Sequence, residues 1–339
     1  MSDLDETRLG DWLTGNVAGF AGPFRLEKFA GGQSNPTYRI DTTSGSYVLR
    51  RKPFGPILPS AHAVEREHQL IAALHPTGFP VARPYGLCED AAVIGAPFYI
   101  MEMIEGRTFW DGSLPDMAPD ARTAVYEAIV DTLAALHSVD YAGVGLGEYG
   151  KPGNYFERQV ARWSKQYRMS QTDDMPEVEK LIEWLPRTVP AQTRTSIVHG
   201  DFRIDNMIFH AAQPRVLAVL DWELSTLGDP LADFSYFLMS WVTAPEGRSG
   251  VQGLTGPATG IPAIEAVVER YCAATGRDGV PDLNWYFAYN LFRLTGIVQG
   301  IKKRVIDGNA SSDQAAKTVE RLPGLAASAW HFAREAGAA

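Results

Sequence analysis

The sequence has few cysteines, no long apolar run and no excess of basic residues. Its two cysteines, Cys88 and Cys272, are far apart in a chain of 339 residues, which excludes a disulfide framework and a cysteine-based zinc site. No apolar stretch approaches the length of a membrane span. With 31 Lys and Arg against 40 Asp and Glu, the net charge is −9, which argues against a nucleic-acid partner.

The N-terminus and the composition favour a cytoplasmic protein. The first residues, MSDLDETRLGDW, are acidic and lack the apolar core of a signal peptide. Hydrophobic residues make up 45% of the chain and charged residues 21%, as in ordinary globular proteins. We therefore expect no membrane and no nucleic-acid partner, and the sequence does not indicate an oligomeric state.

The order of the local patterns predicts an α+β protein with a β-rich front and a mainly helical back. The predicted strands are Phe24–Ala30, Thr37–Asp41, Ser46–Arg50, Ala96–Gly106, Ile197–His199 and Val216–Asp221. The predicted helices are Ser60–His75, with Ser60 as N-cap, Pro119–Ser138, Asn154–Arg168, Pro230–Thr243, Pro262–Thr275, Asp282–Ile301 and Ser311–Ala336. A linker is expected near Met103–Thr108.

The segment HGDFRIDN has the spacing of a kinase catalytic loop, H-R-D-x-x-x-x-N. Asp201 is followed five residues later by Asn206 and is preceded by His199. In such a loop the aspartate accepts the proton of the attacking hydroxyl and the asparagine holds magnesium. Arg203 can offset the negative charge of the transferring phosphate. The alternative is an ordinary solvated surface loop.

A second magnesium ligand is expected downstream of that loop. The segment VLAVLDWE places Asp221 at the end of a buried strand, where kinases carry the aspartate of their DFG motif. A strand, a turn and a second strand would bring Asn206 and Asp221 together. With the following GDPLADF, this combination argues against the solvated-loop alternative.

Together these motifs resemble the aminoglycoside phosphotransferase and choline kinase superfamily, which has a protein-kinase-like fold. A closer likeness is to the kinase-like domain fused to some acyl-CoA dehydrogenases and to its free-standing bacterial relatives. The segments that carry it are GGQSNPTYRI, YVLRRKP, HGDFRIDNMIF, LDWELSTLGDPLADFSYF and LFRLTGIVQGIKKR. The resemblance implies a bilobal ATP-dependent phosphotransferase acting on an alcohol group. Residues 1–103 would form a nucleotide-binding N-lobe, and residues 104–339 a C-lobe with the catalytic loop and the acceptor site.

The resemblance also implies roles for single residues. Asp201 resembles the catalytic base, and Asn206 and Asp221 resemble the ligands of Mg²⁺. His199 resembles the histidine that holds the loop. Asp233 resembles the buried aspartate that supports the same loop from a following helix.

The nucleotide phosphates are expected at the glycine-containing turn AGGQSNPTY. It lacks the G-x-G-x-x-G pattern, and glycines in hairpins are often only turns. In the context of the family it looks like the phosphate loop. Gly31 and Gly32 would let backbone N–H groups approach the phosphates, and Ser34 and Asn35 would lie near them.

A cation from the third strand should hold the α- and β-phosphates. Arg50 occupies the position where kinases normally carry lysine. Arginine and lysine are not interchangeable, so the nearby Lys52 is the alternative candidate. A helix glutamate should pair with that cation. Glu65 and Glu67 are the candidates, and the family pattern favours Glu67. The resemblance further implies that backbone groups near Glu102 and Ile104 bind the adenine of ATP.

The acceptor site is the least determined part. Helical spacing puts Tyr286, Asn290 and Arg293 on one face of the 282–301 helix. This face could form the wall of a pocket, or it could be a polar face in contact with water. The basic run that begins at Arg293 and continues with Lys302, Lys303 and Arg304 favours an anionic acceptor. By resemblance, a hydroxyacyl-CoA is implied. Basic residues that only offset the helix dipole are the alternative.

Three other functions compete with a small-molecule kinase of this type. One is a non-catalytic nucleotide-binding module, although the base and both metal ligands are present. Another is an aminoglycoside- or choline-type phosphotransferase. A metal-dependent hydrolase is the third, but no histidine-rich cluster supports it.

Overall fold

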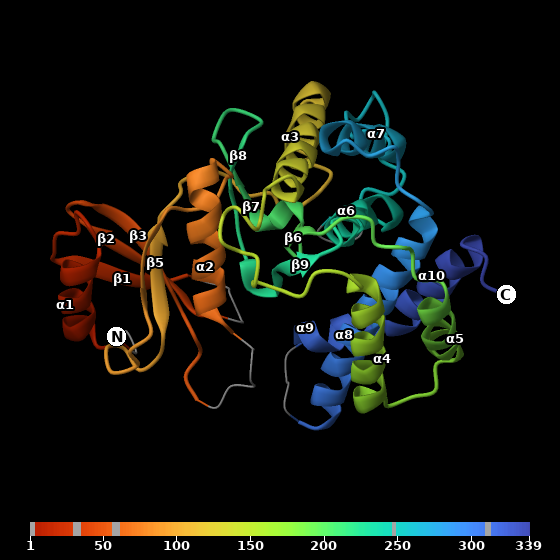
Figure 1. Cartoon of the computed structure of the whole chain (residues 1–339), viewed down its shortest axis with the longest axis horizontal. Coiled ribbons are helices and arrows are strands. Elements are labelled where there is room, and N and C mark those ends of the chain that lie inside the picture. Colours follow the sequence, from red (N-terminus) through yellow and green to blue (C-terminus); the bar gives the residue numbers. More distant parts are fainter. Residues whose placement is uncertain (1–3, 30–34, 56–61, 246–248, 309–312) are drawn as a thin grey trace. The chain divides into compact units, whose positions relative to one another are not determined.

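The chain forms two compact units in the computed structural model (Figure 1), which describes residues 4–29, 35–55, 62–245, 249–308 and 313–339. Unit 1 comprises Met1–Trp110, Val139–Glu148 and Ile204–Ser225. Unit 2 comprises Asp111–Ser138, Tyr149–Arg203 and Thr226–Ala339. A five-stranded sheet lies in unit 1 and most helices lie in unit 2, so the predicted α+β class is confirmed. The lobe boundary expected between residues 103 and 104 stays a prediction.

Unit 1 is built on an antiparallel sheet with the strand order β1-β2-β3-β5-β4. The strands are β1 (Phe24–Lys28), β2 (Thr37–Thr42), β3 (Gly45–Arg51), β4 (Pro84–Cys88) and β5 (Phe98–Glu102). Strand β4 was not predicted because its proline and glycine are poor strand formers. It lies at the edge of the sheet, where a residue without an N–H is tolerated.

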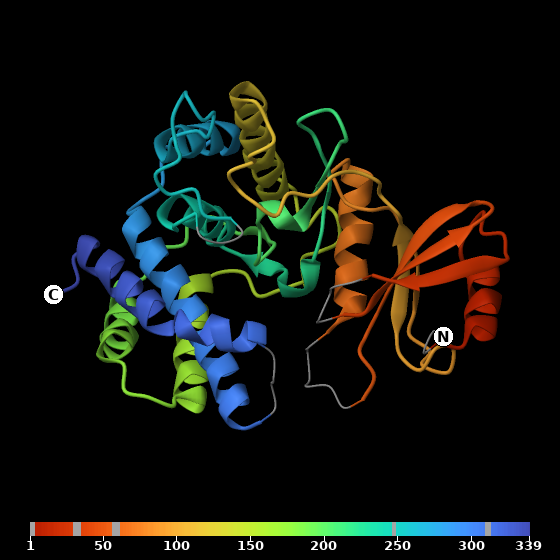
Figure 2. The same cartoon turned by 180° about the vertical axis from the view of Figure 1, so that it is seen from behind.

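Two helices lie on opposite sides of this sheet (Figures 1 and 2). Helix α1 (Glu6–Asn16) was missed from the sequence, although Leu9 and Leu13 have the spacing of one helical face, and both are fully buried against the sheet. Helix α2 (Val64–Leu74) contacts β4 and β5 and ends in a 3₁₀ turn, His75–Thr77. The predicted N-cap of this helix, Ser60, lies outside the described residues.

Unit 1 also contains a hairpin of β7 (Met207–Phe209) and β8 (Val216–Val219), preceded by a 3₁₀ turn, Ile204–Asn206. The chain after β5 crosses this hairpin at Gly106. A Cβ atom at that glycine would lie 2.4 Å from the carbonyl oxygen of Phe209, so only glycine fits. This close approach fixes the hairpin that follows the catalytic-loop motif.

Unit 2 consists of helices and one short strand pair. Helix α8 lies alongside α4 and α10 in both views of the chain (Figures 1 and 2). The helices are α3 (Pro119–His137), α4 (Tyr155–Ser170), α5 (Pro176–Trp184), α6 (Leu231–Leu238), α7 (Ile264–Thr275), α8 (Leu283–Ile306), α9 (Asp313–Glu320) and α10 (Leu322–Glu335). Strands β6 (Ser196–Val198) and β9 (Thr226–Gly228) pair antiparallel and bracket the motif segment.

The predicted helix over residues 311–336 is wrong as a single element, because it is divided into α9 and α10. Arg321 separates the two helices, and Pro323 lies in the first turn of α10. Proline has no N–H to donate and is tolerated only in a first turn, so a new helix begins there. Within the described part of the chain, every helix is too short or too polar to span a membrane.

Candidate active site

The first turn of the loop HGDFRIDN is fixed by one buried carboxylate of α6. Asp233 accepts hydrogen bonds from the backbone N–H of His199 at 2.5 Å and of Gly200 at 2.8 Å. The φ of Gly200 is +88°, a conformation that glycine adopts without a Cβ penalty. Asp233 therefore has the contacts expected of a residue that supports the loop.

Asp201 follows directly and is held through its own backbone. Its N–H donates to Nδ1 of His199 at 3.1 Å, and His199 is fully buried. Nε of Arg203 lies 3.6 Å from Oδ1 of Asp201, and both side chains are partly exposed. The motif histidine thus shapes the turn that presents Asp201, and the arginine places a positive charge beside the carboxylate.

A second histidine, His137 of α3, supports the loop from behind Asp233. Its Nε2 lies 3.4 Å from Oδ2 of Asp233, and its Nδ1 lies 2.7 Å from the hydroxyl of Tyr271. The Tyr271 ring stacks on Phe234 with 3.9 Å between centroids. No local pattern points to this histidine, because nothing in the chain order places the end of α3 beside α6.

Acid should destabilise unit 2 through this buried pair. Burial lowers the pKa of His137, although Asp233 opposes the shift, and hydrogen bonds with His137 and the loop lower the pKa of Asp233 against the effect of burial. A group with a lowered folded pKa contributes stability above its unfolded pKa and loses it as the pH falls. The melting temperature should therefore fall below about pH 6.5, the unperturbed value of histidine.

The matched variant for this pH prediction is His137→Gln, which keeps a hydrogen-bond donor for Asp233 but does not titrate. Its melting temperature, measured from about pH 7 to about pH 5, should change less steeply than that of wild type. His75→Gln, at an exposed histidine, is the control. A slope in His137→Gln equal to the wild-type slope would contradict the assignment.

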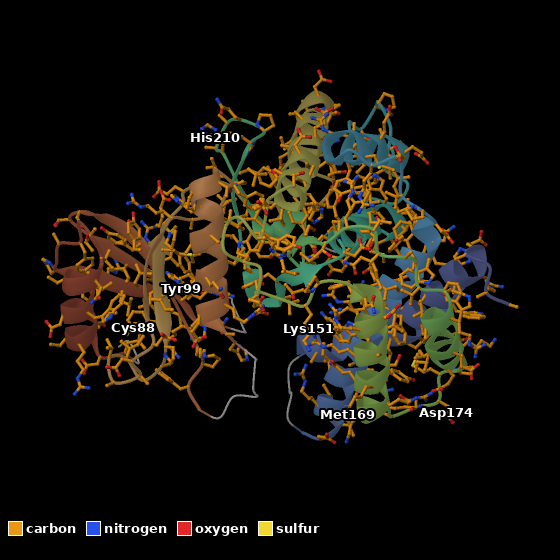
Figure 3. The ribbon with its side chains drawn as sticks, viewed as in Figure 1. Cys88, Tyr99, Lys151, Met169, Asp174 and His210 are labelled. Carbon is orange, nitrogen blue, oxygen red and sulfur yellow. The ribbon has the colours of Figure 1, made fainter. Side chains whose placement is uncertain are left out.

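In unit 1, Arg50 and Glu67 form a buried ion pair between β3 and α2. Nε of Arg50 lies 2.8 Å from Oε2 of Glu67, whose side chain is 2% exposed. Asn35 and Tyr99 also donate hydrogen bonds to this carboxylate, at 2.7 and 3.2 Å. Figure 3 labels Tyr99 on β5. Lys52 pairs instead with Glu65 at 2.5 Å, so the expected cation–glutamate pair is made by Arg50 and Glu67.

The same arginine contacts the carboxylate expected to bind magnesium. Nη2 of Arg50 lies 2.8 Å from Oδ1 of Asp221 and 3.9 Å from Glu223. Asp221 has a φ of +66°, a left-handed conformation that Asp and Asn tolerate better than most residues. The carbonyl of Asn206 accepts a hydrogen bond from the N–H of Leu220 at 2.8 Å, which places Asn206 next to the end of β8.

The charges of this cluster fit a bound divalent cation. Three carboxylates, Glu67, Asp221 and Glu223, lie within 3.9 Å of a single guanidinium, so negative charge is in excess. Burial raises the pKa of Glu67; the charge of Arg50 opposes this shift, and the charges of Asp221 and Glu223 add to it. Carboxylate and amide oxygens are suitable ligands of Mg²⁺, which usually takes one or two carboxylates plus phosphates and water.

The other residues expected to bind the nucleotide are less directly placed. Gly31, Gly32 and Ser34 lie outside the described residues. Asn35 is fully buried and bound to Glu67. The backbone N–H of Glu102 donates to the carbonyl of Arg83 at 2.8 Å. Contacts of these residues and of Ile104 with ATP stay predictions.

Of the three residues expected at the acceptor, Tyr286 and Asn290 are buried in unit 2 and Arg293 is half-buried. Tyr286 and Asn290 are 1% and 0% exposed, and Nδ2 of Asn290 donates to the hydroxyl of Ser235 on α6 at 3.0 Å. Nη2 of Arg293 donates to the carbonyl of Gly200 at 2.7 Å. Most of the polar stripe is therefore packed inside the unit, and its contact with an acceptor stays a prediction.

The basic run at the end of α8 does not form one positive surface. Lys302 pairs with Asp173, and Lys303 pairs with Asp307 at 2.6 Å. Arg293 is turned toward the loop. The argument for an anionic acceptor from this run is therefore weaker than the sequence suggested.

Known proteins are similar to this chain over most of its length. The model of the phosphotransferase enzyme family matches residues 25–281. Acyl-CoA dehydrogenase family member 10 of Mus musculus is 44% identical over 319 residues, which cover 93% of this chain and 30% of that protein. The chain thus spans less than a third of that relative's length.

Solved structures agree with this family. One from Ralstonia eutropha, described as a candidate aminoglycoside phosphotransferase, has 49% identity and a TM-score of 0.91 and covers 98% of this chain and 99% of its own. A ternary complex of the aminoglycoside phosphotransferase APH(4)-Ia with ADP and hygromycin B has 16% identity and a TM-score of 0.58. The match covers 95% of this chain and 98% of that protein, and at this identity it shows a shared fold alone. The chain belongs to the phosphotransferase enzyme family, as its motifs predicted.

Proposed function

We propose that this protein is a small-molecule kinase that transfers the γ-phosphoryl group of ATP to a hydroxyl group of its acceptor. The observation that carries this proposal is the loop HGDFRIDN, whose first turn is held by Asp233 while Asp201 follows it. A solvated surface loop would have no need of a buried carboxylate that binds two successive N–H groups. Family membership supports the same chemistry.

In this proposal each residue has one task. Asp201 accepts the proton of the acceptor hydroxyl as that oxygen attacks phosphorus, and Arg203 offsets charge on the transferring group. Arg50 binds the α- and β-phosphates, and Glu67 orients it. Catalysis depends on positioning and charge stabilisation, with no covalent enzyme intermediate.

Asn206 and Asp221 would hold Mg²⁺ in unit 1. The chemistry that a bound magnesium ion supplies is neutralisation of charge on the β- and γ-phosphate oxygens. Because Asp221 pairs with Arg50, we expect bound nucleotide and Mg²⁺ to share the contacts of these two side chains.

For the acceptor, hydroxyacyl-CoA esters are the first compounds to test. Support comes from the relative's name, which places it in the acyl-CoA dehydrogenase family. Aminoglycosides are the second class, because a protein of the same fold binds hygromycin B together with ADP. A nucleotide-binding module without turnover is the alternative function.

The test is mass spectrometry of a metabolite panel that contains hydroxyacyl-CoA esters and aminoglycosides, incubated with ATP and Mg²⁺. A compound that gains one phosphoryl group with wild type, and does not with Asp201→Asn, would establish the reaction and its acceptor class. If no compound gains phosphate while Mg-ATP still binds, the nucleotide-binding module is favoured. A protein that does not bind Mg-ATP would refute both.

A further inference from the structure

Two side chains of unit 2 approach the loop from elements other than the motif itself. Nη2 of Arg293 on α8 donates to the carbonyl of Gly200 at 2.7 Å. The guanidinium of Arg293 lies 5.2 Å from the centroid of the Tyr236 ring on α6. Tyr236 also lies close enough to Asp201 for the negative charge of that carboxylate to raise the pKa of the tyrosine hydroxyl. Arg293 and Tyr236 therefore both lie beside the turn that presents Asp201.

Both peptide groups around Gly200 are bound as a result. Asp233 binds its N–H at 2.8 Å, and Arg293 binds its carbonyl at 2.7 Å. Glycine has more backbone freedom than any other residue, so an unbound peptide at this point could rotate easily. Rotation of that peptide would turn Asp201, the next residue. His199 holds the N–H of that peptide and Arg293 holds its carbonyl, so the two contacts together oppose this motion.

The charges of the two side chains suit this arrangement. Burial raises the pKa of Tyr236, and the negative charge of Asp201 raises it further, so its hydroxyl keeps its proton and remains a donor. Burial alone would lower the pKa of Arg293, but the nearby tyrosines and Asp201 raise it, so the arginine remains a cation. The faces of Tyr236 and Trp163 lie 5.2 and 5.8 Å from this cation and stabilise it.

We infer that Tyr236 and Arg293 are positioning residues for Asp201: Arg293 fixes the Gly200 carbonyl and the Tyr236 ring, and Tyr236 orients the carboxylate. This inference rests on the proposed function of Asp201 as the base. A carboxylate held by a fixed donor presents its lone pairs in one direction, which is what proton transfer from an acceptor hydroxyl requires. Arg293 acts on the acceptor only through Asp201.

The experiment measures magnesium-dependent ATP hydrolysis with water as the acceptor, which requires no knowledge of the natural acceptor. Tyr236→Phe should lower kcat by roughly 10- to 100-fold, because it removes the hydroxyl beside the Asp201 carboxylate and loosens a reacting geometry. The KM for ATP should stay within about twofold, since neither residue is assigned to the nucleotide. Asp201→Asn should abolish the same hydrolysis, which shows that it occurs at this site.

Arg293 is tested in two steps. Arg293→Met should lower kcat to a similar extent, and Arg293→Lys should restore part of it, because lysine can bind the Gly200 carbonyl but lacks the planar face for Tyr236. The double variant Tyr236→Phe with Arg293→Met should be no slower than the slower single variant, because both act through Asp201. Tyr167→Phe is the matched control and should keep wild-type kcat, because it removes a buried hydroxyl that has no hydrogen-bond partner among the residues that the structure describes.

Unfolding measurements make the inference testable even in a protein that binds Mg-ATP without hydrolysing it. In a cycle of Tyr236→Phe and Asp201→Ala, the changes in unfolding midpoint should not add, because the two side chains interact with each other. Three results would overturn the inference and leave the proposed function intact. They are changes in unfolding midpoint that add in this cycle, a kcat of Tyr236→Phe equal to that of wild type, and a change in KM without a change in kcat for Arg293→Met. If wild type fails to bind Mg-ATP, the proposed function fails and the inference fails with it.

Discussion

Replacing Asp201 with asparagine should lower the rate of phosphoryl transfer by about 10²–10⁴-fold, the usual contribution of a general base. Asparagine has nearly the same shape, and the backbone N–H at this position can still donate to Nδ1 of His199. The loop should therefore keep its conformation while it loses the group that accepts the acceptor proton. The measurements are kcat with the acceptor identified by mass spectrometry and the dissociation constant of Mg-ATP by calorimetry.

Binding of Mg-ATP should be nearly unchanged in this variant, because its ligands are assigned to unit 1. The control is Asp173→Asn, which removes a carboxylate from the surface of unit 2, where it pairs with Lys302. Exposed ion pairs contribute little to stability, so this control should behave as wild type. Full turnover in Asp201→Asn would refute the assigned base, whereas loss of binding together with turnover would indicate a misfolded loop.

Replacing Asp221 with asparagine should remove most of the magnesium dependence of ATP binding. The left-handed backbone at this residue, with a φ of +66°, is one that asparagine also tolerates, so the fold of the hairpin should survive. We expect the affinity for ATP in the presence of Mg²⁺ to fall by more than about tenfold, because even indirect support of a metal ligand contributes that much. Titrations of ATP with Mg²⁺ and with a chelator measure this dependence.

Two controls separate a metal effect from a loss of folding. Asp41→Asn removes a half-exposed carboxylate of unit 1 that pairs with Arg39 and should leave ATP binding unchanged. The melting temperature of Asp221→Asn should stay close to that of wild type, because Arg50 keeps its pair with Glu67 at 2.8 Å. An unchanged magnesium dependence in Asp221→Asn would show that this carboxylate is not a metal ligand.

Much of the fold could be predicted from local pattern. Strands at 24–30, 37–41 and 46–50 are present as β1, β2 and β3 with shifted ends, and the predicted helices at 119–138 and 154–168 are present as α3 and α4. The two elements that were not predicted depend on contacts outside their own segments. Strand β4 forms at a sheet edge despite a proline, and α1 is stabilised by burial of Leu9 and Leu13 against the sheet. Neither partner surface can be read from the short segment itself.

The polar stripe of α8 illustrates the limit of helical periodicity. The spacing of Tyr286, Asn290 and Arg293 was compatible with a pocket wall and with a face in water, because periodicity states which residues share a face and not what covers it. In the structure Tyr286 and Asn290 are covered by protein, and Arg293 is half-buried. Ser235 binds Asn290, and the Gly200 carbonyl binds Arg293.

The family, and the candidate roles of Asp201, Asn206 and Asp221, could be predicted from the order of residues alone, because each motif lies within a few consecutive positions. The side chains that support the loop could be found only once the chain was folded. His137 of α3 contacts Asp233, and Arg293 of α8 binds the carbonyl of Gly200. Helices far apart in the chain supply these contacts, because polar groups removed from water must find partners wherever packing brings them.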